Sequence, residues 1–360
     1  MMTNMIYIVL SFLLSLVSMP IIIAICKKFN LYDYHDKRKI HSGNIPRLGG
    51  IGIFFSFVIN TFLFLALNKN VSIKDNLPIM IACFIIFLFA VLDDIFTFPA
   101  FLKLVVQLTA SAIVTFNGFR FNQIFAWHVP AALSHIITFC WIVGLINAYN
   151  LIDGLDGLCG SLSISAILTI GVLYTFSNNQ EAFICFILAA AILGFLCFNW
   201  PPAKIFMGDC GSQFLGFMIA ILPFYTSGDY FEYNKFLIMI VLTAFPLFDT
   251  IAAIWRRLRD HKPIMSPDKA HLHHKLLNMG YSPRSALYFI FSLQMILCLS
   301  VTLAYFMGTV KGLSVLALST IFMIWIFAII HYTNRGINRQ NRGCLQLQQE
   351  DIQVEENQDK

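Results

Sequence analysis

Long apolar stretches separated by short polar ones dominate the chain. Eleven stretches of about 15–22 residues carry almost no charge, and they lie at about 5–25, 48–67, 77–92, 101–116, 134–149, 159–176, 182–198, 212–226, 235–255, 285–306 and 312–331. A helix of about 20 apolar residues crosses the hydrocarbon core of a bilayer. The pattern therefore predicts an all-α integral membrane protein, with about eleven transmembrane helices within residues 1–331.

The pattern changes after the last stretch. Residues 332–360 are rich in Gln, Asn, Arg and Glu and hold few apolar side chains. Such a segment cannot bury enough apolar surface to fold alone. We expect a polar, disordered cytoplasmic tail.

Composition agrees with this pattern. The 360 residues are 58% hydrophobic and 12% charged, whereas ordinary globular chains are about 45–50% apolar and about 25% charged. This excludes a soluble multidomain protein. The nine cysteines are scattered without a Cys-x-x-Cys pair, so we interpret them as small buried apolar residues rather than as a disulfide framework.

The basic residues predict an orientation. If residues 26–47 lie inside, nineteen of the 24 Lys and Arg residues fall on the inner side and five on the outer side. Cytoplasmic loops of membrane proteins carry such an excess of Lys and Arg. We therefore expect the amino terminus outside and the carboxyl terminus in the cytoplasm. The net charge of +5 reflects this asymmetry and does not indicate nucleic-acid binding.

Six aspartates lie in or beside the apolar stretches, all in the cytoplasmic half: Asp93, Asp94, Asp153, Asp156, Asp209 and Asp249. Ionisable groups inside a bilayer are costly and indicate a functional site. Any one of them could be a helix end wetted by headgroup water. Six in one leaflet favour a recess that opens to the cytoplasm.

The first two acids are adjacent. Asp93 and Asp94 end an apolar stretch, and Lys103 follows early in the next one. Neighbouring carboxylates repel one another unless a cation or a proton intervenes, so the pair could bind Mg²⁺ or hold one carboxylate as a base. Lys103 could face a phosphate or extend its ammonium group to the headgroups.

A second segment carries Asn147, Asn150, Asp153 and Asp156 at a spacing of three residues. Each step of three residues falls about 60° short of a full helical turn, so the four side chains would sweep about half the circumference. Glycines at 154 and 157 weaken a helix further. We predict that a helix ends here and passes into a turn, with polar side chains converging around a ligand.

Two further segments carry candidate chemistry. Asp209, between Gly208 and Gly211, precedes an apolar stretch, where it could cap a helix or bind Mg²⁺. Residues 266–275 include three histidines among cations. This pattern favours an anion-binding loop over a zinc site, although lipid headgroups could also be its ligand.

Asp249 follows Pro246 and could satisfy backbone groups that the proline frees; the sequence assigns it no other role.

Together these segments resemble the polyprenyl-phosphate N-acetylhexosamine-1-phosphate transferase family, also called glycosyltransferase family 4. The matching residues follow in order: Arg38-Lys-x-His41, Ile45–Gly50, Asp93-Asp94, Asn147–Gly157, Gly208-Asp209-x-Gly211-Ser212 and His271-Leu-His273-His274. The resemblance implies transfer of a sugar-1-phosphate from a UDP-sugar to a polyprenyl phosphate, with release of UMP. It also implies a bacterial inner-membrane location, a magnesium cofactor (or Mn²⁺), and a possible homodimer.

The resemblance implies roles on the metal and lipid side of the site. Asp209 matches the magnesium ligand, with Asn150 as a second candidate near the metal. Asp93 matches the base that keeps the lipid phosphate ionised, and Asp94 is its neighbour. Asp93, Asp94 and Asp209 are the catalytic residues that the resemblance implies.

On the donor side, the resemblance implies contacts with the UDP-sugar. Lys103 matches a cation on the pyrophosphate. The other matches lie on the nucleotide side (Asn147, Asp153 and Asp156) and on the sugar-pyrophosphate side (His271, His273 and His274).

Within the family, the histidine segment and Pro46–Gly50 are similar to the branch named for undecaprenyl-phosphate α-N-acetylglucosaminyl 1-phosphate transferases. That branch implies GlcNAc-1-phosphate, undecaprenyl phosphate and the start of a cell-surface glycan, of the O-antigen, enterobacterial common antigen or teichoic acid type. Another UDP-N-acetylhexosamine and UDP-MurNAc-pentapeptide are the alternatives. A transporter is a rival from a different class, but it would need charged groups along a path to both sides.

Overall fold

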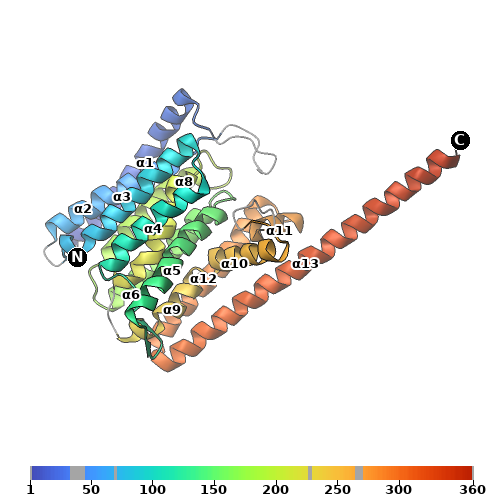
Figure 1. Ribbon diagram of the computed structural model, residues 1–360. Helices are drawn as coiled ribbons and strands as arrows, with labels where there is room; N and C mark the ends of the chain where they lie inside the picture. Colours follow the sequence, from blue (N-terminus) through green and yellow to red (C-terminus); the bar gives the residue numbers. More distant parts are fainter. Residues whose placement is uncertain (1, 33–44, 69–70, 226–228, 264–270, 359–360) are drawn as a thin grey trace.

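The computed structural model describes residues 2–32, 45–68, 71–225, 229–263 and 271–358, and these are almost entirely helical. In chain order the elements are α1 (Met2–Phe29), α2 (Gly49–Leu67), α3 (Ile73–Phe96), α4 (Ala100–Phe116), β1 (Gln123–Ile124), β2 (Trp127–His128), α5 (Ala131–Ile152), α6 (Leu158–Phe176), α7 (Ala182–Asn199), α8 (Gly208–Ile221), η1 (Leu222–Tyr225), α9 (Asp229–Leu242), α10 (Ala244–Arg259), α11 (Leu272–Asn278), α12 (Pro283–Phe306) and α13 (Thr309–Gln358). Figure 1 shows one bundle of roughly parallel helices, with α13 extending beyond it.

In the part of the chain that the structure describes, each apolar stretch predicted from the sequence is mainly helical. Among the described residues, eight helices are long and apolar enough to cross a membrane: α1, α2, α3, α5, α6, α7, α12 and α13. The bent pair α9–α10 provides a ninth candidate span. The remaining two, α4 with 17 residues and α8 with 14, are shorter. The chain is therefore an all-α multi-pass membrane protein, and the full count of eleven spans stays a prediction.

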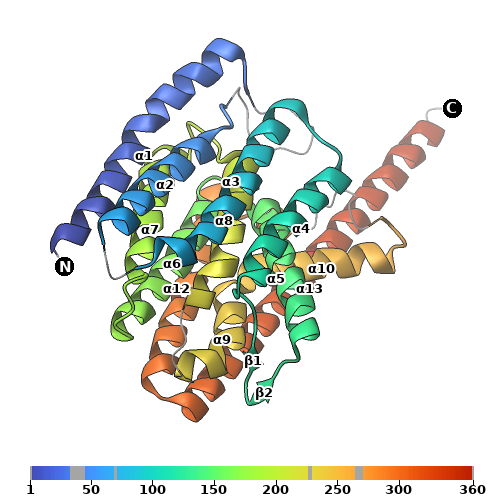
Figure 2. The same ribbon diagram turned by 60° about the vertical axis from the view of Figure 1, so that its left-hand side comes forward.

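The short helix α8 lies at the centre of the bundle, in contact with α2, α3 and α5 (Figure 2). Every residue from Cys210 to Ile221 is buried, as expected for a helix that is apolar all round. Small residues let the backbones approach closely: a Cβ atom on Gly216 would lie 2.8 Å from the Ile146 Cα of α5. This packing fixes the amino end of α8, where Asp209 lies.

Hydroxyl groups join the outer helix α1 to α7. Ser11 Oγ donates to the Ile187 carbonyl at 2.9 Å, and Ser15 Oγ donates to the Ala191 carbonyl at 2.7 Å. Interhelical hydrogen bonds of this kind contribute to helix association in membranes. The opposite face of α1 exposes Val9, Val17 and other apolar side chains, as a surface against lipid would.

The stretch 235–255 does not form the single continuous helix that its hydropathy predicts. Helices α9 and α10 meet at Thr243 with a bend of 76°. Pro246 has no N–H group to offer the Leu242 carbonyl, and the Gln294 side chain of α12 donates to that carbonyl at 3.0 Å. A side chain from a neighbouring helix therefore satisfies the broken turn, and Asp249 has other partners.

Helix α13 continues past residue 331, the predicted end of the membrane domain, to Gln358. Its apolar part, Thr309–Asn338, is a candidate span, and the remainder extends away from the bundle in Figure 1. The division into a membrane domain and a separate tail stays a prediction. Residues Arg38 and His41 of the first loop, and Asp268 and Lys269 of the histidine segment, lie outside the described residues.

Candidate active site

Lys103, near the start of α4, lies between two aspartates from different helices. Its Nζ is 2.5 Å from Asp93 Oδ2 at the end of α3 and 3.3 Å from Asp209 Oδ2 at the start of α8. Figure 2 shows these three helices next to one another. An ammonium group between two carboxylates offsets their mutual repulsion. The structure thus brings together three predicted site residues that are far apart in the sequence.

The two carboxylates of this cluster differ in exposure. The Asp93 side chain is 3% exposed, and its Oδ1 accepts the Phe98 backbone N–H at 2.8 Å. The Asp209 side chain is 33% exposed. Asp93 is therefore held within the protein, whereas Asp209 is the carboxylate that a soluble ligand can reach.

Asn150, in the last turn of α5, also contacts Asp209. Its Nδ2 donates to Asp209 Oδ1 at 3.0 Å and to Ser212 Oγ at 3.1 Å. Both Asp209 oxygens are therefore engaged, one by Asn150 and the other by Lys103. Asn150 and Asp209, the two predicted metal ligands, lie within hydrogen-bond distance of each other.

A chain of buried amides links Asn147 to the same carboxylate. Asn147 Nδ2 donates to Gln107 Oε1 at 2.8 Å, Gln107 Nε2 to Gln213 Oε1 at 3.3 Å, and Gln213 Nε2 to Asp209 Oδ2 at 3.4 Å. Neither glutamine is among the site residues predicted from the sequence. Both could have been noticed as polar residues inside apolar stretches. Gln107 follows Lys103 by four positions, and Gln213 follows Asp209 by four positions. Each glutamine therefore lies on the face of its helix that carries the charged residue.

Asp94 binds the backbone at the start of α8 rather than the side chains of this cluster. Its Oδ1 accepts the Asp209 N–H at 3.1 Å, and its Oδ2 accepts the Cys210 N–H at 3.0 Å. The first N–H groups of a helix have no partner within the helix, and a carboxylate there also interacts well with the helix dipole. Asp94 therefore caps α8 and holds the helix that carries Asp209, and its assignment among the catalytic residues stays a prediction.

The Ile45–Gly50 segment, at the start of α2, packs against this helix start. Phe206 N–H donates to the Pro46 carbonyl at 2.7 Å, and Gly50 N–H donates to the Met207 carbonyl at 2.8 Å. Gly208 has a φ of +75°, a conformation that favours glycine. The Arg47 side chain donates to the Asp94 carbonyl. These bonds explain why two glycine-containing segments distant in sequence meet here.

The segment that follows Asn150 turns as predicted. Helix α5 ends at Ile152, the half-buried Asp153 is its C-cap, and α6 begins at Leu158. Asp156 is buried and its Oδ2 accepts the Ala203 N–H at 2.9 Å. In this structure Asp156 therefore joins the turn to the loop after α7, and the nucleotide-side roles of both acids stay predictions.

The described part of the histidine segment, His271–Lys275, forms the start of the short helix α11, which meets the turn after α5. The His273 ring packs on Gly154, where an added Cβ would lie 2.7 Å from Nε2. The rings of His271 and His273 are parallel at 6.0 Å, and His274 lies 4.3 Å from His273. Burial lowers the pKa of His273 to about 3, so this ring is neutral at pH 7. The three histidines thus lie beside the Asn147–Gly157 segment.

The residues present fit a Mg²⁺ site that a substrate would complete. The described residues contain no group of three or more His, Cys, Asp or Glu side chains arranged to hold a metal. Mg²⁺ usually takes one or two carboxylates together with phosphate oxygens and water. Asp209, exposed by one-third with an amide beside it, suits that arrangement when a diphosphate supplies the remaining ligands.

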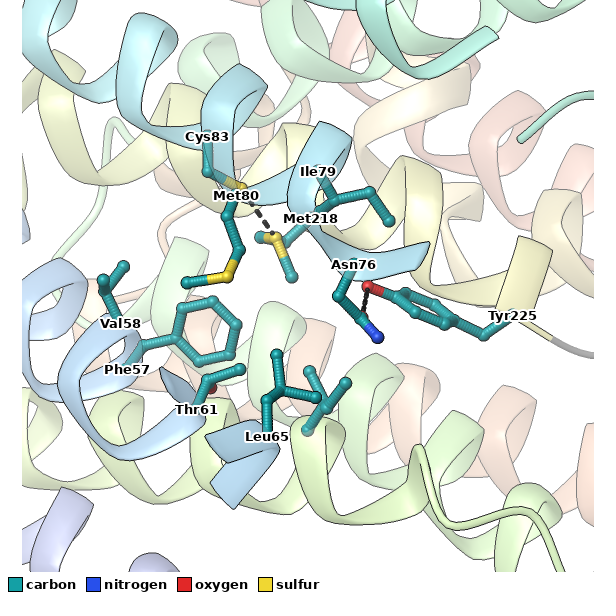
Figure 3. A pocket seen from close by; sticks show the side chains of 11 residues that line it. Phe57, Val58, Thr61, Leu65, Asn76, Ile79, Met80, Cys83, Met218 and Tyr225 are labelled. Carbon is teal, nitrogen blue, oxygen red and sulfur yellow. Dashed lines mark hydrogen bonds between the residues drawn. The ribbon is translucent and has the colours of Figure 1, made fainter. Parts of the chain in front are cut away.

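A small cavity of about 20 Å³ lies at the other end of α3 (Figure 3). Its walls are mainly apolar, and Asn76 Oδ1 accepts the Tyr225 hydroxyl at 2.7 Å at one side. Asn76 is about 25 Å along the helix from Asp93 at 1.5 Å per residue. Because of this distance, the cavity is separate from the candidate active site. Its volume suits about one water molecule.

Comparisons with known proteins agree with this geometry. A model of glycosyl transferase family 4 matches residues 76–227, which include the Asp93, Lys103, Asn150 and Asp209 positions. A protein of Bacillus subtilis (strain 168), named as a probable undecaprenyl-phosphate N-acetylglucosaminyl 1-phosphate transferase, is 35% identical over 83% of this chain and 87% of its own length.

Two further relatives have similar names. The decaprenyl-phosphate N-acetylglucosaminephosphotransferase of Mycobacterium tuberculosis (strain H37Rv) is 31% identical over 72% of each chain. The undecaprenyl-phosphate alpha-N-acetylglucosaminyl 1-phosphate transferase of Escherichia coli (strain K12) is 31% identical over 73% of each chain. The chain therefore belongs to glycosyl transferase family 4, in the branch of the undecaprenyl-phosphate N-acetylglucosaminyl 1-phosphate transferases.

Proposed function

We propose that this protein transfers GlcNAc-1-phosphate from UDP-GlcNAc to undecaprenyl phosphate and releases UMP. The observation that carries the proposal is the Asp93–Lys103–Asp209 cluster, with Asn150 beside it. The names of the relatives from three bacteria support the sugar and a polyprenyl phosphate acceptor, and two of the three name undecaprenyl phosphate. The product would start a lipid-linked glycan of the cell surface.

The reaction joins two anions, which decides what the site must supply. An oxygen of the lipid phosphate attacks the β-phosphorus of UDP-GlcNAc, and the bond from that phosphorus to the bridging oxygen breaks. The bridging oxygen leaves with UMP. Phosphoryl transfer of this kind depends mainly on positioning and on charge stabilisation. A buried carboxylate, a lysine and a half-buried carboxylate within a few ångströms are suited to both.

Each residue of the cluster has a role in this scheme. Lys103 would neutralise charge on the pyrophosphate as the bridging bond breaks. Asp93, held against Lys103 and the Phe98 N–H, would keep the lipid phosphate deprotonated. Asp209 and Asn150 would hold Mg²⁺, which supplies further charge neutralisation on the diphosphate when bound. The amide chain through Gln107 and Gln213 would keep the Asp209 carboxylate oriented.

We further propose eleven spans, with the amino terminus outside and the active site facing the cytoplasm from the bacterial inner membrane. The distribution of Lys and Arg residues supports this orientation. UDP-sugars are made in the cytoplasm, whereas a polyprenyl phosphate stays in the bilayer. A carboxylate recess at the level of the inner headgroups would let the two meet.

A product assay tests the proposal. Purified protein in lipid nanodiscs would receive undecaprenyl phosphate, Mg²⁺ and one UDP-sugar at a time, chosen from UDP-GlcNAc, UDP-GalNAc and UDP-MurNAc-pentapeptide. We expect equal amounts of UMP and a lipid-linked product with UDP-GlcNAc. No product with any of the three would contradict the function, and product with only another donor would contradict the sugar.

A matched pair of lysine variants connects that activity to the cluster. Lys103→Met should lower kcat by about 10²–10³-fold, the usual effect of losing one charge-stabilising donor. Lys204→Met changes an exposed lysine in the loop after α7 and should leave kcat unchanged. Equal activity of the two variants would contradict the role of Lys103.

A further inference from the structure

Asp249 is a buried acid for which the reaction scheme above has no role. It lies in the second turn of α10, just after the bend at Thr243, and is 2% exposed. The broken turn does not need it, because Gln294 donates to the freed Leu242 carbonyl. A buried carboxylate is costly unless its oxygens have partners, so its own partners indicate what it does.

Both oxygens of Asp249 bind the first residues of the histidine segment. Oδ2 lies 2.8 Å from His271 Nδ1, and Oδ1 accepts the Leu272 backbone N–H at 2.9 Å. His271 is itself buried. The carboxylate therefore caps α11 and favours a proton on His271 Nδ1. A hydrogen-bond partner on one ring nitrogen fixes the tautomer of the imidazole and the direction in which its other nitrogen points.

This contact determines where the rest of α11 lies. The helix has only seven residues, so an anchor at Leu272 fixes His273 and His274 as well. His273 is 1% exposed and packs on Gly154, one residue after Asp153. A second bond holds the middle of α11: Asn334 Nδ2 donates to the Lys275 carbonyl at 3.2 Å. Asp249 is thus connected through α11 to the turn that follows Asn150.

We propose that Asp249 is a positioning residue for the donor side of the active site. It holds His271 and the start of α11 so that the histidine segment faces the UDP-sugar, while the carboxylate itself contacts no substrate. The inference rests on the proposed function for the identity of the donor. It predicts that loss of the carboxylate weakens use of the nucleotide-sugar and leaves use of the lipid phosphate unchanged, because Asp93 and Lys103 have different partners.

The test compares Asp249→Asn with Asp260→Asn. The first keeps one acceptor for the Leu272 N–H but places an amide against His271 Nδ1. The second makes the same chemical change at the exposed C-cap of α10, beside Arg259. We expect Asp249→Asn to raise KM for UDP-GlcNAc about tenfold or more, with KM for undecaprenyl phosphate within about twofold of wild type. Asp260→Asn should leave both constants unchanged.

A double-variant cycle distinguishes positioning from loss of fold. Asp249→Ala and His271→Ala should each raise KM for UDP-GlcNAc. The KM of the double variant should be within about twofold of that of the more affected single variant, because both changes remove the same Asp249–His271 contact. Additive effects, or equal increases in both KM values, would contradict the inference. So would a fall in kcat alone.

Direct binding of UDP separates this inference from the proposed function. Wild-type protein should bind UDP in a calorimetric titration, and Asp249→Asn should bind it about tenfold more weakly. A wild type that binds UDP but forms no product would contradict the proposed function alone. Equal UDP affinity in wild type and Asp249→Asn would contradict the positioning role alone.

Discussion

Asp93 and Asp94 are adjacent in the chain but have different partners. Asp93 lies against Lys103, whereas both Asp94 oxygens accept backbone N–H groups at the start of α8. Successive residues near the end of a helix point about 100° apart. One carboxylate can therefore face the candidate active site while its neighbour supports the helix that completes it.

Replacement of Asp94 tests this division. Asp94→Asn retains one acceptor oxygen for two N–H groups, and a buried donor left without a partner costs about 1–3 kcal/mol. We expect a melting temperature several degrees lower in detergent, together with reduced activity. Asp75→Asn, an exposed change in the first turn of the same helix, is the control. Wild-type thermal stability with lost activity would instead make Asp94 a reacting group.

His273 gives a prediction about pH. Burial lowers its pKa from the ordinary value of 6.5 to about 3, and His271 and His274 contribute in the same direction while Asp249 opposes them. Below pH 6.5 the unfolded chain takes up a proton that the folded ring does not. The free energy of unfolding therefore decreases as the pH is lowered from about 6.5 toward 3. His273→Gln should flatten the dependence of melting temperature on pH in this range.

His128→Gln is the control, because His128 is exposed on β2. It should leave the slope of melting temperature against pH as in wild type. A wild-type slope in His273→Gln would show that other groups determine the pH dependence.

The candidate residues could be found from the sequence because acids and amides stand out in apolar stretches. Lys103, Asp209, Asn150 and Asn147 do meet in one network. The roles of Asp94 and Asp249 could not be found in this way. Each binds backbone N–H groups of a helix distant in the chain, and capping across such a distance depends on the packed arrangement of helices, which residue spacing does not contain.

At the scale of elements, α8 depends on a close approach by α2. A Cβ atom on Gly50 would collide with the backbone of Gly211, whereas nothing lies within 4 Å of such an atom on Gly144 in α5. The contact sits beside the Met207 carbonyl that accepts the Gly50 N–H. It therefore controls the position of the helix start that carries Asp209.

Two alanine substitutions compare these glycines. Gly50→Ala should lower both the melting temperature and kcat, because backbone must move to admit the methyl group. Gly144→Ala should be neutral or stabilise the protein by about 0.4–1 kcal/mol, since alanine favours a helix where space is open. Thermal unfolding and product formation in the same detergent would measure both. Equal behaviour of the two variants would contradict the close contact.

Hydropathy predicted where the helices lie. It did not predict the interruption between α9 and α10 or the short length of α8. The stretch 235–255 is apolar throughout its length apart from a few residues, so its hydropathy alone does not predict the bend at Thr243. The bend depends on Pro246 together with a partner for the Leu242 carbonyl from α12. The central position of α8 likewise follows from the surrounding helices.

At the scale of the whole molecule, the six aspartates belong to one connected region. Asp93, Asp94 and Asp209 meet directly around the start of α8. The turn after Asn150, with Asp153 and Asp156, adjoins α11 through Gly154 and His273, and Asp249 anchors α11. Such a connected group of acids suits the proposed reaction between a membrane lipid and a soluble nucleotide.

The proposed orientation can be checked with cysteine labelling. Ala126→Cys lies in the turn between β1 and β2 and should react with a membrane-impermeant maleimide in intact cells. Lys204→Cys, in the loop after α7, should react only after the inner membrane is permeabilised. Both positions are exposed, and wild-type protein reports background from native cysteines. The reverse pattern would contradict the orientation.

The most direct test of the central claim follows the β-phosphate of the donor. Wild-type protein would receive undecaprenyl phosphate, Mg²⁺ and UDP-GlcNAc with radioactive phosphorus only in the β-phosphate. We predict that all of the transferred label enters the lipid product together with the sugar and that the released nucleotide is unlabelled UMP. Labelled UDP, formed by transfer of the sugar without its phosphate, would contradict the account.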